Sequence, residues 1–255
     1  MGEFTGKVAL VTGTTGIARS TALRLKAGGA SVMAVGIDEA GNAALAADGV
    51  TVQRTDVSVS DQVQAAVAET VSRFGGLDII VNSAAIHPYG DAVTTSPAVF
   101  ARCLAVNVGS IHLTAHFGVP EMRKRGGGAI VNVASVQGHA CQANVMAYVA
   151  SKGAMHAMTR AMALDLAADR IRVVSVSPGS VRTPILALAA RTFDGPDADI
   201  DAVFARFGAA HPIGRIGEPE EIAEFIAYLT SDKAGFITGS DHIIDGGLTA
   251  GLGVR

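Results

Sequence analysis

Short apolar runs alternate with segments of helical periodicity along almost the whole of this 255-residue chain. The runs are apolar at consecutive positions, which is typical of parallel strands covered by helices on both faces. Because right-handed crossovers join such strands, the pattern predicts one α/β domain over residues 1–255, with a Rossmann-like, doubly wound parallel sheet of about seven strands. The predicted strands are 8–11, 31–35, 50–54, 77–81, 129–134, 171–176 and 242–244.

Apolar residues recur every three or four positions between these strands, as they do on amphipathic helices. The segment 184–219 interrupts the alternation with scattered prolines and glycines, and its length predicts a substrate loop or lid that contains short helices. Ligands of doubly wound sheets bind beyond the carboxyl ends of the strands, so residues that follow each strand are the functional candidates. The predicted helices are 16–28, 39–47, 60–74, 97–125 and 146–168.

The composition excludes several classes of protein. The net charge is −3 and only 5% of the residues are aromatic, so the chain lacks the basic, aromatic-rich surface expected of a nucleic-acid-binding protein. The first apolar run is too short for a signal peptide or a membrane span, which predicts a cytoplasmic protein without a membrane partner. Cys103 and Cys141 lie outside any metal-ligand spacing, so we expect two buried thiols and no metal.

Four polar residues lie near strand ends or on a helix beside them: Asn107, Ser135, Tyr148 and Lys152. Ser135 follows a predicted strand directly, which puts its hydroxyl at the carboxyl edge of the sheet. Tyr148 and Lys152 share one face of a predicted helix. A tyrosine acts as a base near neutral pH only if its pKa falls from about 10 by roughly three units, and the nearby ammonium of Lys152 is the expected cause. The set predicts proton transfer at an alcohol or carbonyl whose oxygen is also bonded by Ser135.

These residues belong to a longer series of motifs. The series consists of TGTTGIA at residues 12–18, Asp56 with Val57, NSAA at residues 82–85, Asn107, Ser135, Tyr148 with Lys152, PGSVRTP at residues 178–184 and TGSDHIIDGG at residues 238–247. In its order and spacing the series resembles the short-chain dehydrogenase/reductase family over essentially the whole chain. The resemblance implies an NAD(P)-dependent oxidoreductase that interconverts a secondary alcohol and a ketone by hydride transfer.

The resemblance also implies a role for each matching residue. Tyr148 is the general acid/base and Ser135 orients the substrate oxygen. Lys152 bonds the nicotinamide ribose and lowers the tyrosine pKa, and Asn107 holds a water in a proton relay. The implied cofactor-binding residues are Gly13, Thr14, Thr15, Gly16, Ile17, Gly36, Ile37, Asp38, Asp56, Val57, Asn82, Ser83, Ala84, Tyr148, Lys152, Pro178, Gly179, Val181 and Thr183.

The glycine turn departs from the family pattern. The family places three residues between its first two glycines, whereas Gly13 and Gly16 enclose two, and Ala18 replaces the third glycine. A phosphate site needs backbone N–H groups and a helix N-terminus, and a shorter turn can still supply both. We therefore expect dinucleotide binding to be retained but weakened.

The residues after the second predicted strand bear on the choice between NAD and NADP. Family enzymes that use NAD tend to carry Asp where this chain has Gly36, and those that use NADP tend to carry Arg where it has Ile37. Asp38 lies close to the spacing at which an acidic residue meets the ribose hydroxyl, and it would repel a 2′-phosphate. The charge favours NAD, although Arg19 and Arg54 are candidates to offset it.

Family geometry indicates a pocket for a medium-sized, largely apolar ketone or secondary alcohol. The expected substrate-binding residues are Ser135, Gln137, Asn144, Val145, Tyr148 and Leu186, with His87, His139, Ser180, Ile185 and Leu188 as further candidates. The apolar, glycine-rich segment 238–255 predicts a two-fold interface and hence a homotetramer. Two alternatives remain: a cofactor-free lyase such as the halohydrin dehalogenases, which place Arg where this chain has Lys152, and a nucleotide-sensing protein without turnover.

Overall fold

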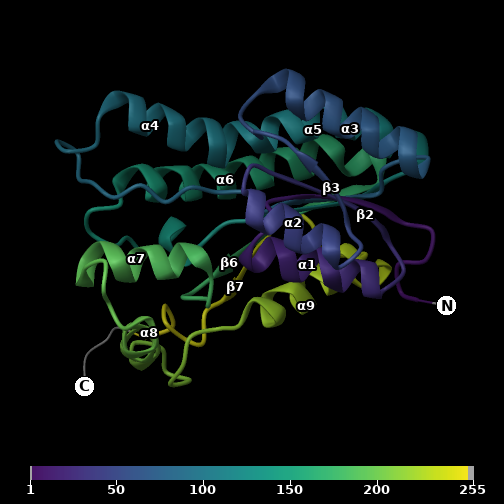
Figure 1. Cartoon of the computed structure of the whole chain (residues 1–255). Coiled ribbons are helices and arrows are strands. Elements are labelled where there is room, and N and C mark those ends of the chain that lie inside the picture. Colours follow the sequence, from purple (N-terminus) through teal and green to yellow (C-terminus); the bar gives the residue numbers. More distant parts are fainter. Residues whose placement is uncertain (1, 252–255) are drawn as a thin grey trace.

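Seven parallel strands form a single sheet in the order β3-β2-β1-β4-β5-β6-β7 (Figure 1). The structure is a computed structural model and describes residues 2–251. The strand order reverses between β1 and β4, which is where doubly wound sheets bind ligands. All seven predicted strands are confirmed, with small shifts at their ends. The strands are β1 (Val8–Thr12), β2 (Ser31–Gly36), β3 (Thr51–Arg54), β4 (Ile79–Asn82), β5 (Gly128–Val133), β6 (Ile171–Pro178) and β7 (Asp241–Ile244).

Helices cover both faces of the sheet, so each face has its own apolar core. On one face α1 (Gly16–Ala27), α2 (Glu39–Ala47) and α9 (Pro219–Thr230) pack against the strands. On the other face lie α3 (Ser60–Phe74), α5 (Ser110–Arg125) and α6 (Met146–Leu166), as Figure 1 shows. The two layers explain why the strands are apolar at consecutive positions.

The helices differ from the sequence prediction in three places. The predicted helix 97–125 divides into α4 (Pro97–Leu104), a π-helical segment (Ala105–Gly109) and α5. Helix α9 was not predicted, because its apolar stripe directly follows the irregular segment 184–219. The third difference concerns the start of α3: Ser60 followed by Asp61 predicts a capping serine there, but Ser60 is the first helical residue, Val59 is the N-cap, and no side chain caps this end.

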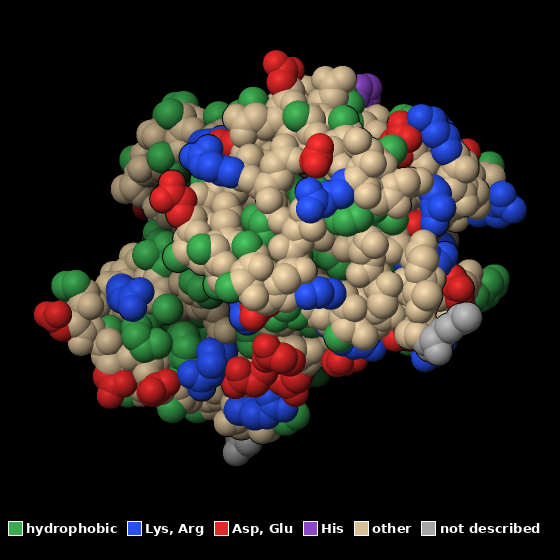
Figure 2. All heavy atoms as spheres, turned by 45° about the vertical axis from the view of Figure 1, so that its right-hand side comes forward, with side chains coloured by type: hydrophobic (Ala, Val, Ile, Leu, Met, Phe, Trp, Pro, Cys, Tyr) green, Lys and Arg blue, Asp and Glu red, His purple; other side chains and the backbone are tan. Residues whose placement is uncertain are grey.

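The segment 184–219 contains two helices, α7 (Pro184–Asp194) and α8 (Ile200–Ala209), which agrees with the prediction of short helices there. Both lie on the carboxyl side of the strands, away from α1 and α9 (Figure 1). Leu188 and Phe193 of α7 are about half exposed, at 49% and 51%. Apolar side chains gather on the lobe at the lower left of Figure 2, beside a hollow.

The helical stretch from Pro97 to Arg125 is 29 residues long and contains an 18-residue window with a mean hydropathy of 1.3, which by length and composition alone would suit a membrane span. Its apolar residues have another explanation. Ile111, Val119 and Met122 are buried within the protein, where α5 packs on the sheet. The pattern is therefore that of a core helix.

Candidate active site

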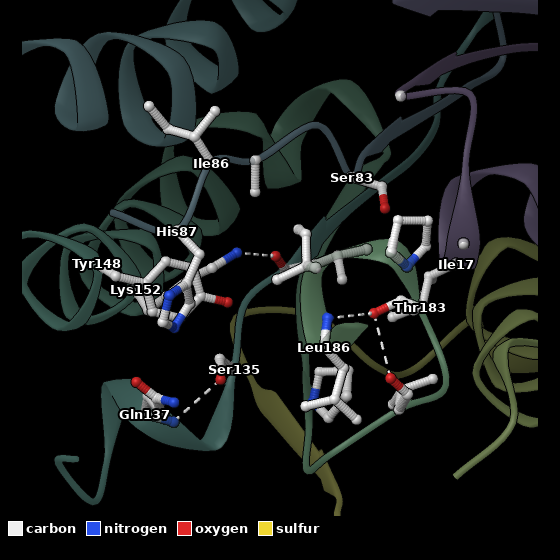
Figure 3. A pocket seen from close by; sticks show the side chains of 18 of the residues that line it. Ile17, Ser83, Ile86, His87, Ser135, Gln137, Tyr148, Lys152, Thr183 and Leu186 are labelled. Carbon is white, nitrogen blue, oxygen red and sulfur yellow. Dashed lines mark hydrogen bonds between the residues drawn. The ribbon is translucent and has the colours of Figure 1, made fainter. Parts of the chain in front are cut away.

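A cleft of about 770 Å³ opens at the carboxyl ends of the strands, between the glycine turn and α7 (Figure 3). Most of the predicted site residues line this cleft. They are Gly13, Thr14, Thr15, Gly16, Ile17, Gly36, Ile37, Asp38, Asp56, Val57, Ser83, Ala84, Ser135, Gln137, Tyr148, Lys152, Pro178, Gly179, Val181, Thr183 and Leu186. His87, Ser180 and Ile185 line it as well.

The shortened glycine turn leads straight into the N-terminus of α1. Gly13 has φ +95° and Gly16 has φ +50°, a region that favours glycine. A Cβ on Gly13 would lie 2.9 Å from Ala18 Cβ, and one on Gly16 would lie 2.9 Å from Thr183 Cγ2. The N-cap of α1 makes no side-chain hydrogen bond, so the N–H groups of the first turn face the cleft without a cap.

Thr14 shows how the turn accommodates its missing residue. A Cβ on Gly36 would lie 3.0 Å from Thr14 Oγ1, and one on Gly41 would lie 2.9 Å from the carbonyl oxygen of Thr14. Thr14 thus lies against Gly36, where a side chain at position 36 would collide with it. Its hydroxyl is buried and has no hydrogen-bond partner among residues 2–251. The two differences from the family pattern, Gly36 and the shortened turn, are therefore connected: the absence of a side chain at Gly36 makes room for Thr14.

Two acidic residues lie at the far end of the cofactor half. Asp38 Oδ1 accepts a hydrogen bond from Gly41 N at 2.6 Å and caps α2, which leaves its second oxygen exposed. Asp56 accepts hydrogen bonds from Ser58 and pairs with Arg102 at 2.9 Å. Arg102 lines the cleft and was not predicted, because it lies on α4 rather than after a strand. Arg19 is instead paired with Asp48.

Ser135, Tyr148 and Lys152 meet in the middle of the cleft (Figure 3). Ser135 Oγ accepts a hydrogen bond from Gln137 N at 3.1 Å, which directs its own hydrogen elsewhere, toward Tyr148 in the protein alone. Lys152 is 2% exposed, and its Nζ donates to the carbonyl oxygen of Val133 at 2.7 Å. This ammonium lies 5.3 Å from the centroid of the Tyr148 ring. The three residues form a proton-transfer group shielded from water.

The pKa of Tyr148 differs from the sequence expectation. In the protein alone, burial raises this pKa above its usual value of about 10, and the neighbouring Ser135 hydroxyl lowers it only in part. Burial also lowers the pKa of Lys152 to about 7. The predicted lowering of the tyrosine pKa is therefore wrong for the protein alone, because burial disfavours the charged phenolate and only the Ser135 hydroxyl opposes this effect.

Asn107 lies behind the cleft rather than in its wall. It is fully buried in the π-helical segment, where its Oδ1 accepts from Ile86 N at 2.9 Å. Its Nδ2 donates to Ile86 O and to Ser151 Oγ, and Ser151 in turn donates to the carbonyl oxygen of Tyr148. Asn107 thereby ties the loop after β4 to the helix that carries Tyr148. The π-helical turn, a common feature of functional sites, places it there.

Three predicted ligand-binding residues lie outside the cleft lining. Asn82 is buried between strands, where its Nδ2 donates to Asn132 Oδ1 and its Oδ1 accepts from Thr114 Oγ1. Val145 is fully buried, and it bridges Gly90 through the backbone. Asn144 adopts a left-handed conformation with φ 60°, and its carbonyl accepts from Gly90 N. Asn82 thus links β4 to β5 and α5, whereas Asn144 and Val145 hold the loop at Gly90.

Two of the weaker candidates, together with the second cysteine, are also placed differently from the sequence expectation. His139 and Leu188 do not line the cleft. Cys103 is buried as predicted, but Cys141 is exposed and lines the cleft, because it lies in the loop that follows Ser135.

The substrate half of the cleft carries polar atoms without partners. His87 Nδ1, Tyr89 Oη and Gln137 Oε1 are buried and make no hydrogen bond within the described residues. The His87 ring lies 4.0 Å from the Tyr148 ring, and Tyr89 packs edge-on against Phe193 of α7. Tyr89 was not predicted, because no strand or helix period marks it. Burial lowers the pKa of His87 to about 4, so the ring is neutral near pH 7.

A glycine turn at a helix N-terminus beside a buried Ser-Tyr-Lys group defines a nicotinamide-dependent oxidoreductase site on a Rossmann-like sheet. The comparisons agree: the sequence profile described as enoyl-(acyl carrier protein) reductase matches residues 11–249. The chain belongs to the short-chain dehydrogenase/reductase family. The family resemblance inferred from the motifs is thus confirmed.

Curated relatives and a solved structure match over nearly the full length. The chain is 36% identical to a cyclohexanol dehydrogenase of Acinetobacter sp. strain SE19, covering 97% of each chain. It is 38% identical to a cis-4-hydroxycyclohexanecarboxylate dehydrogenase of Sinomonas cyclohexanicum, covering 98% of this chain and 100% of the other. The ligand-free aldohexose dehydrogenase of Thermoplasma acidophilum superposes with a TM-score of 0.94 at 33% identity, over 100% of this chain and 98% of that one.

Proposed function

We propose that this enzyme interconverts a secondary alcohol on a ring with the corresponding ketone, using NAD. The observation that carries the proposal is the convergence of Ser135, Tyr148 and Lys152 in one cleft with the uncapped N-terminus of α1. The named relatives add that similar chains are dehydrogenases of cyclohexanol and of a hydroxycyclohexanecarboxylate.

The glycine turn fits a dinucleotide. The pyrophosphate would lie against the first turn of α1, where backbone N–H groups and the positive end of the helix dipole favour negative charge. The unpartnered hydroxyl of Thr14 supplies a further donor there. Side chains are excluded at Gly13 and Gly16 by close contacts, which leaves the backbone accessible to the ligand. When bound, the nicotinamide supplies or accepts the hydride.

The chain itself handles the proton. The Ser135 hydroxyl, which faces Tyr148 in the protein alone, would donate to the substrate oxygen and fix that oxygen next to the Tyr148 hydroxyl. Burial keeps Tyr148 protonated in the protein alone, so it is ready to donate a proton to a ketone oxygen. In the opposite direction a phenolate must form, and the Lys152 ammonium beside the ring stabilises it.

The cofactor preference is assigned to NAD on charge. The free oxygen of Asp38 lines the cleft at the end of β2, where it would oppose a 2′-phosphate. Arg102, the cation that lines this end of the cleft, is engaged by Asp56 and Ser58.

The substrate half favours a ring alcohol that carries a second oxygen. An orphaned donor or acceptor costs about 1–3 kcal/mol unless a ligand satisfies it, and His87, Tyr89 and Gln137 each present one. The apolar side chains of Ile86, Leu186 and Phe193 would cover the ring carbons. Diols, hydroxy acids and sugars combine these two features, whereas a simple alcohol leaves the polar atoms unpaired.

Two titrations and one substrate panel test the proposal. We expect NADH to bind with a change in nicotinamide fluorescence, more tightly than NADPH, and turnover of cyclic hydroxyketones and diols. Tyr89→Phe removes one orphaned hydroxyl and should raise KM for diols while leaving KM for cyclohexanol unchanged. Failure of both cofactors to bind at millimolar concentration would instead favour the cofactor-free lyase, and binding without turnover would favour a nucleotide sensor.

We also propose a homotetramer. Phe236 is fully exposed, and Leu164, Tyr228 and Ile243 are 81%, 40% and 50% exposed. Ile243 lies on β7 at the edge of the sheet, where an unpartnered strand invites pairing with a second copy. The end of the predicted interface segment, residues 252–255, lies outside the described residues. Light scattering at the mass of one chain would contradict the assembly.

Figure 2 shows acidic and basic side chains intermixed over the face it presents, which is consistent with the small net charge. A surface of this kind offers no continuous basic track for a nucleic acid backbone.

A further inference from the structure

Three side chains that are far apart in the sequence meet outside the cleft. His139 ends the short 3₁₀ helix η2 (Val136–Gly138), His156 lies on α6 and Asp241 begins β7. His139 Nε2 lies 2.7 Å from Asp241 Oδ2, and His156 Nε2 lies 3.5 Å from Asp241 Oδ1. All the ligand-type atoms fall within 4.8 Å of one another. No sequence spacing marks this cluster, because His139 and Asp241 are 102 positions apart.

The cluster is held in place from several sides. Asp241 Oδ1 accepts hydrogen bonds from Ser175 Oγ at 2.6 Å and from Ser177 Oγ at 2.9 Å, which orients the carboxylate. The two imidazole rings are stacked, with centroids 4.2 Å apart and planes 19° apart. Gly138 makes this packing feasible, because a Cβ there would lie 2.4 Å from His156 Cε1. Ligands anchored by outer hydrogen bonds in this way are a feature of metal sites.

Both Nε2 atoms are turned toward one carboxylate group and its hydroxyl partner. That of His139 lies 2.7 Å from Asp241 Oδ2, and that of His156 lies 3.0 Å from Ser177 Oγ, which itself donates to Asp241 Oδ1. Neutral imidazoles with one carboxylate are a ligand set suited to divalent transition metals.

We propose that His139, His156 and Asp241 form a binding site for Zn²⁺ or a similar first-row divalent ion. Nε2 of each ring and one oxygen of Asp241 are the ligands. Each neutral ring then carries its proton on Nδ1, and the hydrogen bonds from Nε2 to Asp241 and Ser177 are replaced by bonds to the metal. The His139 side chain is 39% exposed, so the ion can enter from solvent and keep a water as a further ligand.

The site would brace the active centre without touching the substrate. Ser135 begins the turn that His139 ends, and Lys152 lies one helical turn before His156 on α6. A bound ion would join η2, α6 and β7, which are otherwise linked only by hydrogen bonds and packing. Since the ion binds the folded protein alone, it should raise stability as its concentration rises.

The test uses the full chain without an affinity tag and titrates it with Co²⁺ and with Zn²⁺. His112 and His116 are exposed on α5 with ring centroids 5.7 Å apart and are a second metal-binding candidate, so the titration uses a His112→Ala/His116→Ala background. We expect a dissociation constant below about 100 µM by calorimetry, a Co²⁺ visible absorption band, and a rise in Tm of about 5 °C at saturation.

Two variants connect the binding to the cluster. His139→Ala removes an exposed ligand, and Asp241→Asn keeps an oxygen that Ser175 and Ser177 can bond. Each should weaken Co²⁺ binding at least tenfold and abolish the rise in Tm, with circular dichroism unchanged when no metal is present. Binding that is unchanged in both variants, or no binding by the background protein, overturns the proposal.

Discussion

The cofactor end and the substrate end of the cleft present different kinds of binding group. At the cofactor end the binding groups are backbone N–H groups in the first turn of α1. Gly13 and Gly16, with positive φ angles, form the turn that leads into this helix. At the substrate end the polar groups are the side chains of His87 and Tyr89 from the loop after β4 and of Gln137 from the short helix η2. A backbone site tolerates altered side chains and even a missing residue, provided that neighbours such as Gly36 make room. A side-chain site changes specificity with each substitution.

The largest effect is expected where the two ends meet. Tyr148→Phe removes the proton donor but keeps the ring that packs on His87, so kcat should fall by about 10²–10⁴ while NADH affinity stays the same. Steady-state kinetics and fluorescence titration measure the two quantities. Tyr89→Phe serves as the control and should change kcat less than about tenfold. Retention of full kcat by Tyr148→Phe would contradict the assigned role.

Gly13→Ala tests the backbone character of the cofactor end. The new Cβ would meet Ala18 and sit in a φ of +95°, so we expect a loss of about 1–3 kcal/mol in the free energy of unfolding and weaker NADH binding. Gly6→Ala is the matched control, because Gly6 has φ +78° with no atom near the added Cβ. Denaturant melts and NADH titrations of both variants separate strain from contact. If both variants lose equal NADH affinity, the turn is not the cofactor site.

The same contrast explains what the sequence could predict. Strand runs and helix periods predicted the sheet, because burial between two helical layers leaves consecutive apolar residues in every strand. The position of the Ser-Tyr-Lys group could be predicted equally well, since Ser135 follows a strand and Tyr148 and Lys152 are one helical turn apart. Helix α9 was missed, because its start at Pro219 follows directly on the irregular segment before it.

The remaining errors concern side-chain direction and burial. Nothing in the sequence shows that Val145 turns into the core, that Tyr89 turns into the cleft, or that Arg102 reaches Asp56 from α4. The pKa of Tyr148 was mistaken for a related reason: spacing predicts the approach of Lys152, but not the completeness of burial, which decides the direction of the shift. Long-range contacts of this kind depend on loops that carry no periodic signal.

At the substrate end, the burial of His87 should make the free energy of unfolding depend on pH. The pKa of His87 is about 4 in the folded protein and about 6.5 when unfolded, so the unfolded chain takes up the proton first as the pH falls. Stability is therefore lost from about pH 6.5 down to about pH 4, by up to about 3 kcal/mol. His87→Gln should flatten this part of the curve, whereas His116→Gln, at an exposed position, should not. Denaturant melts at a series of pH values make the comparison, and parallel curves for wild type and His87→Gln would refute it.

The smallest expected effect is on the choice between NADH and NADPH, for which we propose that the charge of Asp38 at the cofactor end is responsible. Asp38→Asn removes the negative charge but keeps an oxygen that can cap α2 through Gly41 N, so the helix should remain intact. An exposed charge acts through solvent, and its removal should improve NADPH binding relative to NADH by about three- to tenfold, equivalent to roughly 1 kcal/mol. Glu39→Gln removes a neighbouring exposed charge that does not line the cleft and should leave the ratio unchanged. Equal ratios for the two variants would show that Asp38 does not face the ribose, and cofactor choice would then pass to Arg102 and its pairing with Asp56.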